Sequence, residues 1–116
     1  TFGNIVVHNH DHYEPGYSRD EERDINEWLN FKDIDLLLNY LSKEYEPSHK
    51  KEFSIDSNDI IGVCKYTRTS DSGVGVNTFS IYGCDKETLE QIQDFIMSDK
   101  MPERRAEIWE SIKLKN

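Results

Sequence analysis

Three histidines at alternate positions are the residues of this sequence best suited to chemistry. The stretch VVHNHDHYEPGY, residues 6–17, places His8, His10 and His12 directly after a short apolar run. In an extended strand, alternate side chains point the same way at intervals of about 6.7 Å. Neighbouring imidazoles at that spacing are able to share a zinc or copper ion. The pattern therefore predicts, as one of two functions, a metal-binding protein or a metal-dependent enzyme.

The competing interpretation of this stretch is a polar strand end that faces solvent or a partner. The zinc-enzyme patterns H-E-x-x-H and H-x-E with C-x-x-C are absent from the chain. Carboxylate pairs such as Asp33 with Asp35 occupy ordinary solvated positions. Cys84 follows Gly83 near an expected helix start, which lowers a thiol pKa, but no particular histidine is placed beside it. We therefore expect no catalytic residue and no resident cofactor, and we favour the partner-facing interpretation.

The negative charge of the chain is concentrated in one segment. The formal net charge is −9, from 23 acidic and 14 basic side chains. Residues 11–46 hold 11 acidic and four basic side chains, a net charge of −7, and residues 47–116 have a net charge of only −2. A concentrated negative surface repels nucleic acid and anionic membranes and attracts basic proteins. We expect a basic protein partner, with no direct contact to nucleic acid or membrane.

Aromatic side chains accompany this acidic segment, as they do in many protein interfaces. The leading prediction is a small inhibitor of the immunity-protein or antitoxin kind, which neutralises a basic partner such as a bacterial nuclease toxin by occluding its active site. A third interpretation is an adaptor domain whose acidity only maintains solubility. The residues expected to contact the partner are Tyr13, Glu14, Tyr17, Asp20, Glu21, Asp24 and Glu27.

Periodicity in the sequence predicts both strands and helices. The β-branched run 4–7 predicts a short strand, followed by a turn at 14–17. Ser18 and Glu21 have capping-box spacing, and Ile25, Trp28 and Leu29 share one helical face, which predicts a helix over 18–30. Apolar residues at spacings of three and four predict further helices, namely one over 31–45, one beginning after Asp85 and one beginning at Pro102.

Residues 60–68 and 76–84 are rich in β-formers and predict an antiparallel hairpin, and FSI within 48–59 predicts a minor strand. The expected fold is α+β, a single domain over 1–116 in which a small antiparallel sheet, a short N-terminal strand plus a hairpin, packs with about four helices.

The two cysteines bear on disulfides and on the cellular compartment. A hairpin centred near Ser72 places Cys64 opposite Ser80, and Cys84 about 13 Å farther along the ladder, which is too far for a disulfide. Free thiols are typical of a reducing compartment, and no run of 18 or more apolar residues occurs. We expect a cytoplasmic location.

Overall fold

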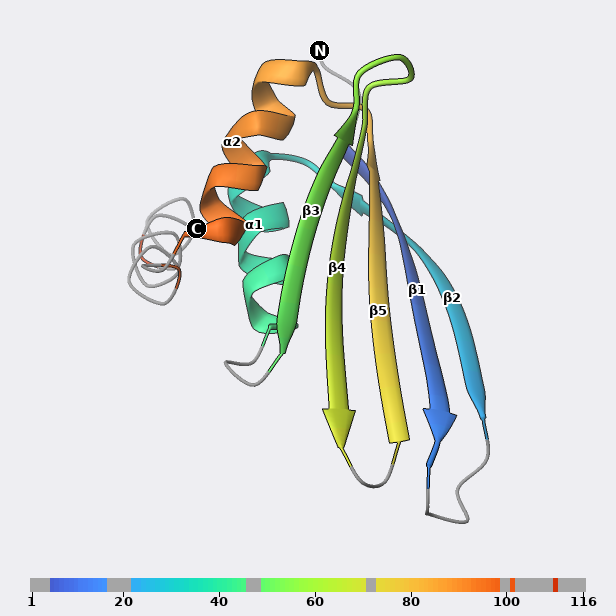
Figure 1. Ribbon diagram of the computed structural model, residues 1–116. Helices are drawn as coiled ribbons and strands as arrows, with labels where there is room; N and C mark the ends of the chain where they lie inside the picture. The colour runs from blue at the N-terminus through green and yellow to red at the C-terminus, as the bar shows by residue number, and fades with distance from the viewer. Residues whose placement is uncertain are drawn as a thin grey trace.

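The computed structural model of the chain describes residues 5–16, 22–45, 49–70 and 73–98, together with Met101 and Glu110. These residues form five strands and two helices (Figure 1). The strands are β1 (Ile5–Pro15), β2 (Arg23–Phe31), β3 (Lys50–Asp56), β4 (Ile61–Ser70) and β5 (Gly73–Tyr82). The helices are α1 (Ile34–Lys43) and α2 (Lys86–Met97).

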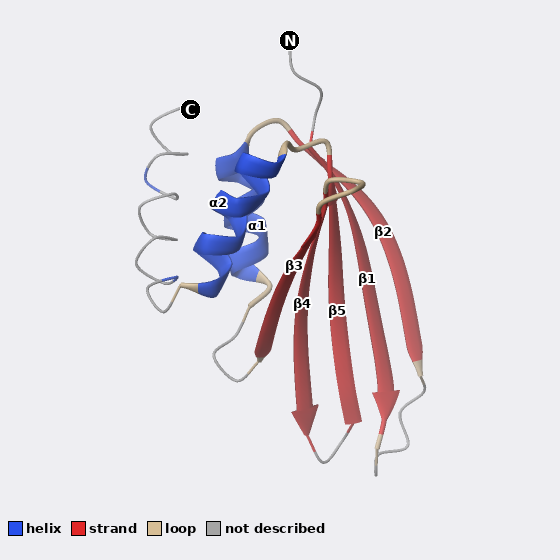
Figure 2. Ribbon diagram, turned by 45° about the horizontal axis from the view of Figure 1, so that its top comes forward, coloured by secondary structure: helices blue, strands red, loops and turns tan. Residues whose placement is uncertain are grey.

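All five strands belong to one antiparallel sheet with the order β2-β1-β5-β4-β3. Both helices lie on the same side of this sheet, as Figure 2 shows. We call that side the helix face, to which Val7 and Ile81 belong, and the opposite side the open face, to which His8 and Ser80 belong. The lower ends of β4, β5, β1 and β2 extend beyond the helices (Figure 1).

The hydrophobic core lies between the helix face and the two helices. Alternate residues of the central strands are fully buried there because side chains on a strand alternate between the two faces. Gly62 on β4 lets α2 approach closely, since a Cβ at that position would lie 2.8 Å from Cδ2 of Leu89. The fully buried apolar residues are Val7, Leu37, Leu41, Cys64, Phe79, Ile81, Leu89, Ile92, Phe95 and Ile96.

The expected arrangement of a small sheet with about four helices is wrong. The sheet has five strands, and the described residues contain two helices rather than four. The N-terminal strand is also longer than expected, because β1 continues through all three histidines and ends at Pro15. The helix expected to begin at Pro102 lies outside the described residues, except for Glu110.

A strand, β2, replaces most of the helix expected over 18–30. Its backbone pairs with β1 along its whole length, which satisfies its hydrogen-bonding groups on that side. Ile25 and Leu29 fit a period of two as well as a helical period, so only Trp28 favoured the helix. In the strand both residues point to the helix face, whereas Trp28 points to the open face. Tertiary pairing therefore overrode the local helical signal.

The two described helices were both predicted, and side chains cap each of them. Asp33 accepts a hydrogen bond from the backbone N–H of Leu36 at 3.0 Å at the start of α1. Asp85 accepts one from the backbone N–H of Thr88 at 2.8 Å at the start of α2. Such caps satisfy the unpaired N–H groups of a helix start. Within the described ranges, neither helix is long and apolar enough to cross a membrane.

The hairpin of β4 and β5 and the minor strand β3 are confirmed, with a different hairpin register. Cys64 lies opposite Phe79 rather than Ser80, because only residues 71–72 separate the two strands. Cys64 and Cys84 are both free thiols, as expected.

A buried tyrosine connects the sheet to α1. Tyr66 is 2% exposed, and its hydroxyl donates a hydrogen bond to the backbone carbonyl of Leu41 at 2.8 Å. We expect Tyr66→Phe to reduce the free energy of unfolding by about 1–2 kcal/mol, because the carbonyl loses its buried donor. Urea unfolding measures this change. Tyr82→Phe, on the open face, is the control and is expected to change stability by less than about 0.5 kcal/mol; equal losses in the two variants would contradict the assignment.

Candidate functional site

The three histidines of β1 form a row on the open face. His8, His10 and His12 alternate with residues that point to the helix face, such as Asn9, whose side-chain amide donates to the Tyr40 hydroxyl at 3.1 Å. The ring centroids of His8 and His10 are 6.4 Å apart, and those of His10 and His12 are 6.2 Å apart. The same-side spacing predicted from the sequence is confirmed.

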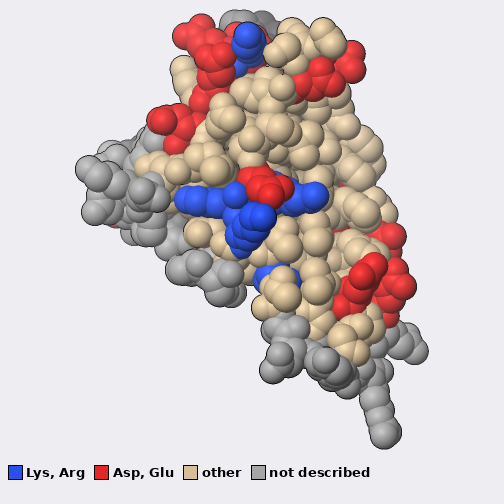
Figure 3. Space-filling view, in the orientation of Figure 1, with Lys and Arg blue, Asp and Glu red and all other residues tan. Residues whose placement is uncertain are grey.

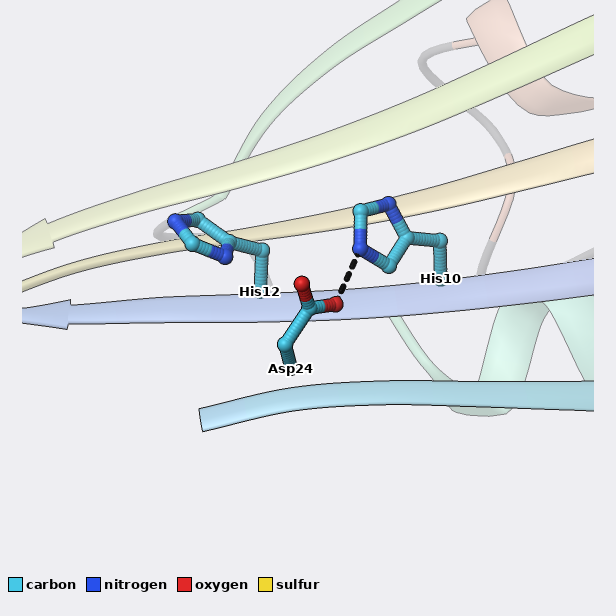
Figure 4. Close-up of side chains that lie close together, drawn as sticks. All are labelled: His10, His12 and Asp24. Atoms are coloured by element: carbon cyan, nitrogen blue, oxygen red, sulfur yellow. Dashed lines mark hydrogen bonds and ion pairs between the residues drawn. The ribbon is translucent and has the colours of Figure 1, made fainter. Parts of the chain in front are cut away.

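Two of these histidines meet carboxylates. Nε2 of His10 contacts Oδ1 of Asp24 on the neighbouring strand β2, as Figure 4 shows. Nε2 of His12 lies 3.1 Å from Oε1 of Glu14 and 3.7 Å from Oε1 of Glu22. His10, His12 and Asp24 each offer a ligand atom within 4.8 Å of the others, and we call these three residues the His–Asp cluster. They come from two adjacent strands and point to one side (Figure 4).

His8 lies in an aromatic environment instead. Its ring centroid is 4.5 Å from that of Trp28, and the Trp28 ring is 6.0 Å from Tyr82. Among the described residues, ligand atoms lie together in the His–Asp cluster and in the group of His12, Glu14 and Glu22, and His8 belongs to neither. The row of three histidines expected to bind a metal is therefore divided into two residues with carboxylate partners and one stacked on an indole.

The acidic neighbours change the protonation of His12. Its hydrogen bond to Glu14, and then the negative charges of Glu14, Glu22 and Asp24, raise the pKa of His12 above the usual value. Folding therefore shifts the protonation equilibrium of His12 toward the protonated form. Its interactions stabilise the fold at pH below the unfolded pKa, and this contribution is lost as the pH rises through the higher folded pKa.

The residues expected to contact a basic partner do not form one surface. Glu14 and Asp24 lie on the open face beside the histidines. Tyr13 and Glu27 point to the helix face, where Arg23 lies 5.2 Å from the centre of the Tyr13 ring and the Glu27 charge helps to raise the pKa of Tyr40. Tyr17, Asp20 and Glu21 lie outside the described residues.

Acidic side chains still gather on the surface. Figure 3 shows one group of them over the lower ends of β1 and β2, others at the top of the view, and Lys and Arg side chains at its centre. On β3, Nζ of Lys50 pairs with Oε1 of Glu52 at 3.5 Å. Asp24, Glu14 and Glu22 are the carboxylates that lie beside His10 and His12.

Neither cysteine has the environment of a nucleophile. Burial raises the pKa of the Cys64 thiol to about 12 and that of Cys84 to about 11. The lowered pKa considered for Cys84 does not fit this environment, since burial and then the negative charge of Asp85 both raise the pKa of its thiol. Thiol chemistry at neutral pH does not fit this chain.

Asp24 was predicted to contact a basic protein, not to be a partner of the histidines. Asp24 reaches them because β2 pairs with β1 in a register that sets Asp24 opposite His12, and His10 is its diagonal neighbour. The signal that could have revealed a strand there was the separation of Ile25, Leu29 and Phe31 by even numbers of positions, as expected for one face of a strand.

Comparison of the chain with known proteins identifies no family to which it belongs. The chain matches no protein-family model, no curated protein and no solved structure.

The interaction between His12 and Glu14 generates a titration prediction. We expect Glu14→Gln to lower the pKa of His12 toward 6.5, because the variant removes the charge and the strongest acceptor. An NMR titration of the imidazole C–H resonances measures the pKa directly. Glu52→Gln, on the distant strand β3, is the control and should leave His12 unchanged; an unchanged His12 in Glu14→Gln would show that Glu14 does not set this pKa.

Proposed function

We propose that this protein binds a divalent transition-metal ion of the zinc class at the His–Asp cluster. The observation that carries the proposal is the convergence of ligand atoms of His10, His12 and Asp24 within 4.8 Å on adjacent strands. Two imidazole nitrogens and a carboxylate oxygen form a donor set that suits zinc, copper or nickel better than magnesium or calcium.

The spacing of the ligand atoms supports this proposal. Zn–N bonds of about 2.0–2.1 Å place the ligands of a tetrahedral site roughly 3.3 Å from one another. The three atoms lie within 4.8 Å already, so side-chain rotations close the remaining distance without a change of the backbone. Both strands hold their residues through continuous pairing, which reduces the entropic cost of assembling the site.

Three protein ligands leave a fourth position of a tetrahedral ion for water or another molecule. The side chains of His10 and Asp24 are 39% and 56% exposed, so the ion would be accessible from solvent. Such accessibility supports exchangeable binding rather than a closed structural site. Protons compete with the ion at His12, whose pKa is raised, so affinity should increase as the pH rises through that pKa.

Substitution of single ligands tests the metal proposal. We expect His10→Ala, His12→Ala and Asp24→Asn each to weaken zinc binding at least tenfold, about 1.4 kcal/mol, because each removes one of three ligands. Isothermal titration calorimetry at pH 7.5, with protein lacking a polyhistidine tag, measures the affinity and the stoichiometry.

His8→Ala is the matched control, because His8 lies in the same row but outside the cluster. It should change zinc affinity less than twofold. Absence of zinc binding in the unsubstituted protein, or an equal loss in His8→Ala, would contradict the assigned site.

A second proposal retains the inhibitor function predicted from the sequence, with β2 as the contact surface. Trp28 and Ile25 are 62% and 50% exposed on this edge strand, Trp28 on the open face with Asp24 and Ile25 on the helix face with Glu27. Exposed Trp side chains often anchor protein interfaces, and an edge strand offers unpaired backbone groups. The carboxylates would pair with Lys or Arg of a basic nuclease toxin and so exclude its phosphate substrate.

Charge reversal on β2 tests the second proposal. We expect the protein to inhibit at least one member of a panel of purified basic nuclease-toxin domains, and Glu27→Lys to weaken that inhibition at least tenfold at low salt. Glu90→Lys, on the exposed side of α2, is the charge-matched control and should have little effect. Lack of inhibition across the panel, or inhibition insensitive to Glu27→Lys, would count against β2 as an inhibitory surface.

A further inference from the structure

A polar pocket lies on the helix face, on the opposite side of the sheet from the His–Asp cluster. Its volume is about 170 Å³, and it opens between the end of α1 and the strands β1, β4 and β5. A cavity of about 150 Å³ is large enough for a molecule of the size of benzene. The pocket is therefore large enough for a small organic molecule, and its lining determines which kind.

The charges of the lining balance. Asp11 and Glu44 supply two carboxylates, and Lys43 and Arg68 supply two cationic groups. A site for a simple anion or cation would carry an excess of the opposite charge. Equal numbers of both signs fit a ligand that itself carries one charge of each sign.

Hydrogen-bond acceptors line one part of the pocket. Asn77 and Asp11 are direct partners across β5 and β1, so their side chains are neighbours on the helix face. Oδ1 of Asn77 is buried and has no hydrogen-bond partner among the described residues. A buried acceptor without a donor is costly, so this position favours a ligand that brings N–H groups. An ammonium beside the Asp11 carboxylate provides both the donors and the opposite charge.

The Arg68 side chain supplies a cationic group farther along the strands. Arg68 is the partner of Gly75 on β5, and a Cβ added to Gly75 would lie 2.8 Å from Nε of Arg68. The guanidinium therefore packs over the glycine backbone, two residues along the strand from Asn77. Two residues of a strand span about 7 Å, so a small molecule with hydrogen bonds of about 3 Å at each end is able to reach both Asn77 and the Arg68 guanidinium.

We propose that this pocket binds a small zwitterion, a free α-amino acid, with its ammonium at Asp11 and Asn77 and its carboxylate at Arg68. The proposal rests on the lining of the pocket alone and is independent of the metal and inhibitor proposals. Guanidinium and carboxylate form paired, charge-assisted hydrogen bonds, which gives the carboxylate end its orientation.

The first experiment identifies the ligand. Each of the twenty free amino acids is added to the full chain, and binding is followed by thermal shift and then by isothermal titration calorimetry. Every amino acid that binds is compared with its amide, which lacks the carboxylate, and with its deaminated acid, which lacks the ammonium. We expect both analogues to bind at least tenfold more weakly. No binding by any of the twenty would overturn the proposal, and an amide that binds as well as the acid would overturn the role of Arg68.

The second experiment locates the site. Asp11→Asn and Arg68→Gln should each weaken binding at least tenfold, with the zinc affinity of the His–Asp cluster unchanged. Gly75→Ala keeps every charge but forces the Arg68 side chain to move, so it should also weaken binding. Lys65 lies on the same strand as Arg68 but on the open face, so Lys65→Gln is the control and should bind the amino acid normally. Unaltered binding in both Asp11→Asn and Arg68→Gln would overturn the site.

A stability measurement distinguishes a ligand-binding role of Asn77 from a structural one. Asn77→Leu removes the buried acceptor that has no partner, so it should raise the melting temperature of the ligand-free protein while it weakens amino-acid binding. A merely structural asparagine would give a lower melting temperature when replaced. That result, together with unchanged binding, would overturn the assignment of Asn77.

Discussion

The antiparallel pairing of β1 between β2 and β5 is the constraint on which two proposed sites depend, the His–Asp cluster and the polar pocket of the helix face. Because strand side chains alternate, this pairing sends the residues of the segment HNHDH to opposite faces of the sheet. His10 and His12 point to the open face and Asp11 points to the helix face. A register shift of one residue would exchange the two sets and abolish both sites.

The helices determine how the two faces differ. They cover the upper part of the helix face and enclose the core, and the lower strands extend beyond them (Figure 1). Polar residues such as Asn77 line the pocket at the border between the covered and uncovered parts. The open face has no described helix above it, so its histidines and carboxylates remain partly accessible to solvent. Partial coverage therefore produces a recessed polar pocket on one side and an accessible cluster on the other.

Local signals were sufficient where several of them agreed. Both α1 and α2 combine a capping aspartate, Asp33 or Asp85, with apolar residues at helical spacing, and both were predicted. The hairpin of β4 and β5 was also predicted, but its register was not, because the register depends on the length of the turn. The prediction for the β2 segment failed because Ile25 and Leu29 fit a strand as well as a helix, and the pairing with β1 that selects the strand is not visible in the local spacing.

The sequence by itself determined the alternation of the histidines, the concentration of negative charge and the positions of the two described helices, since each depends on residue types and their local spacing. Only the tertiary structure decided that Asp24 joins His10 and His12, that His8 stacks on Trp28, and that Asp11, Asn77 and Arg68 line one pocket. These groupings bring together residues from different strands, and the register of strand pairing is set by burial of one face of the sheet together with the geometry of the turns.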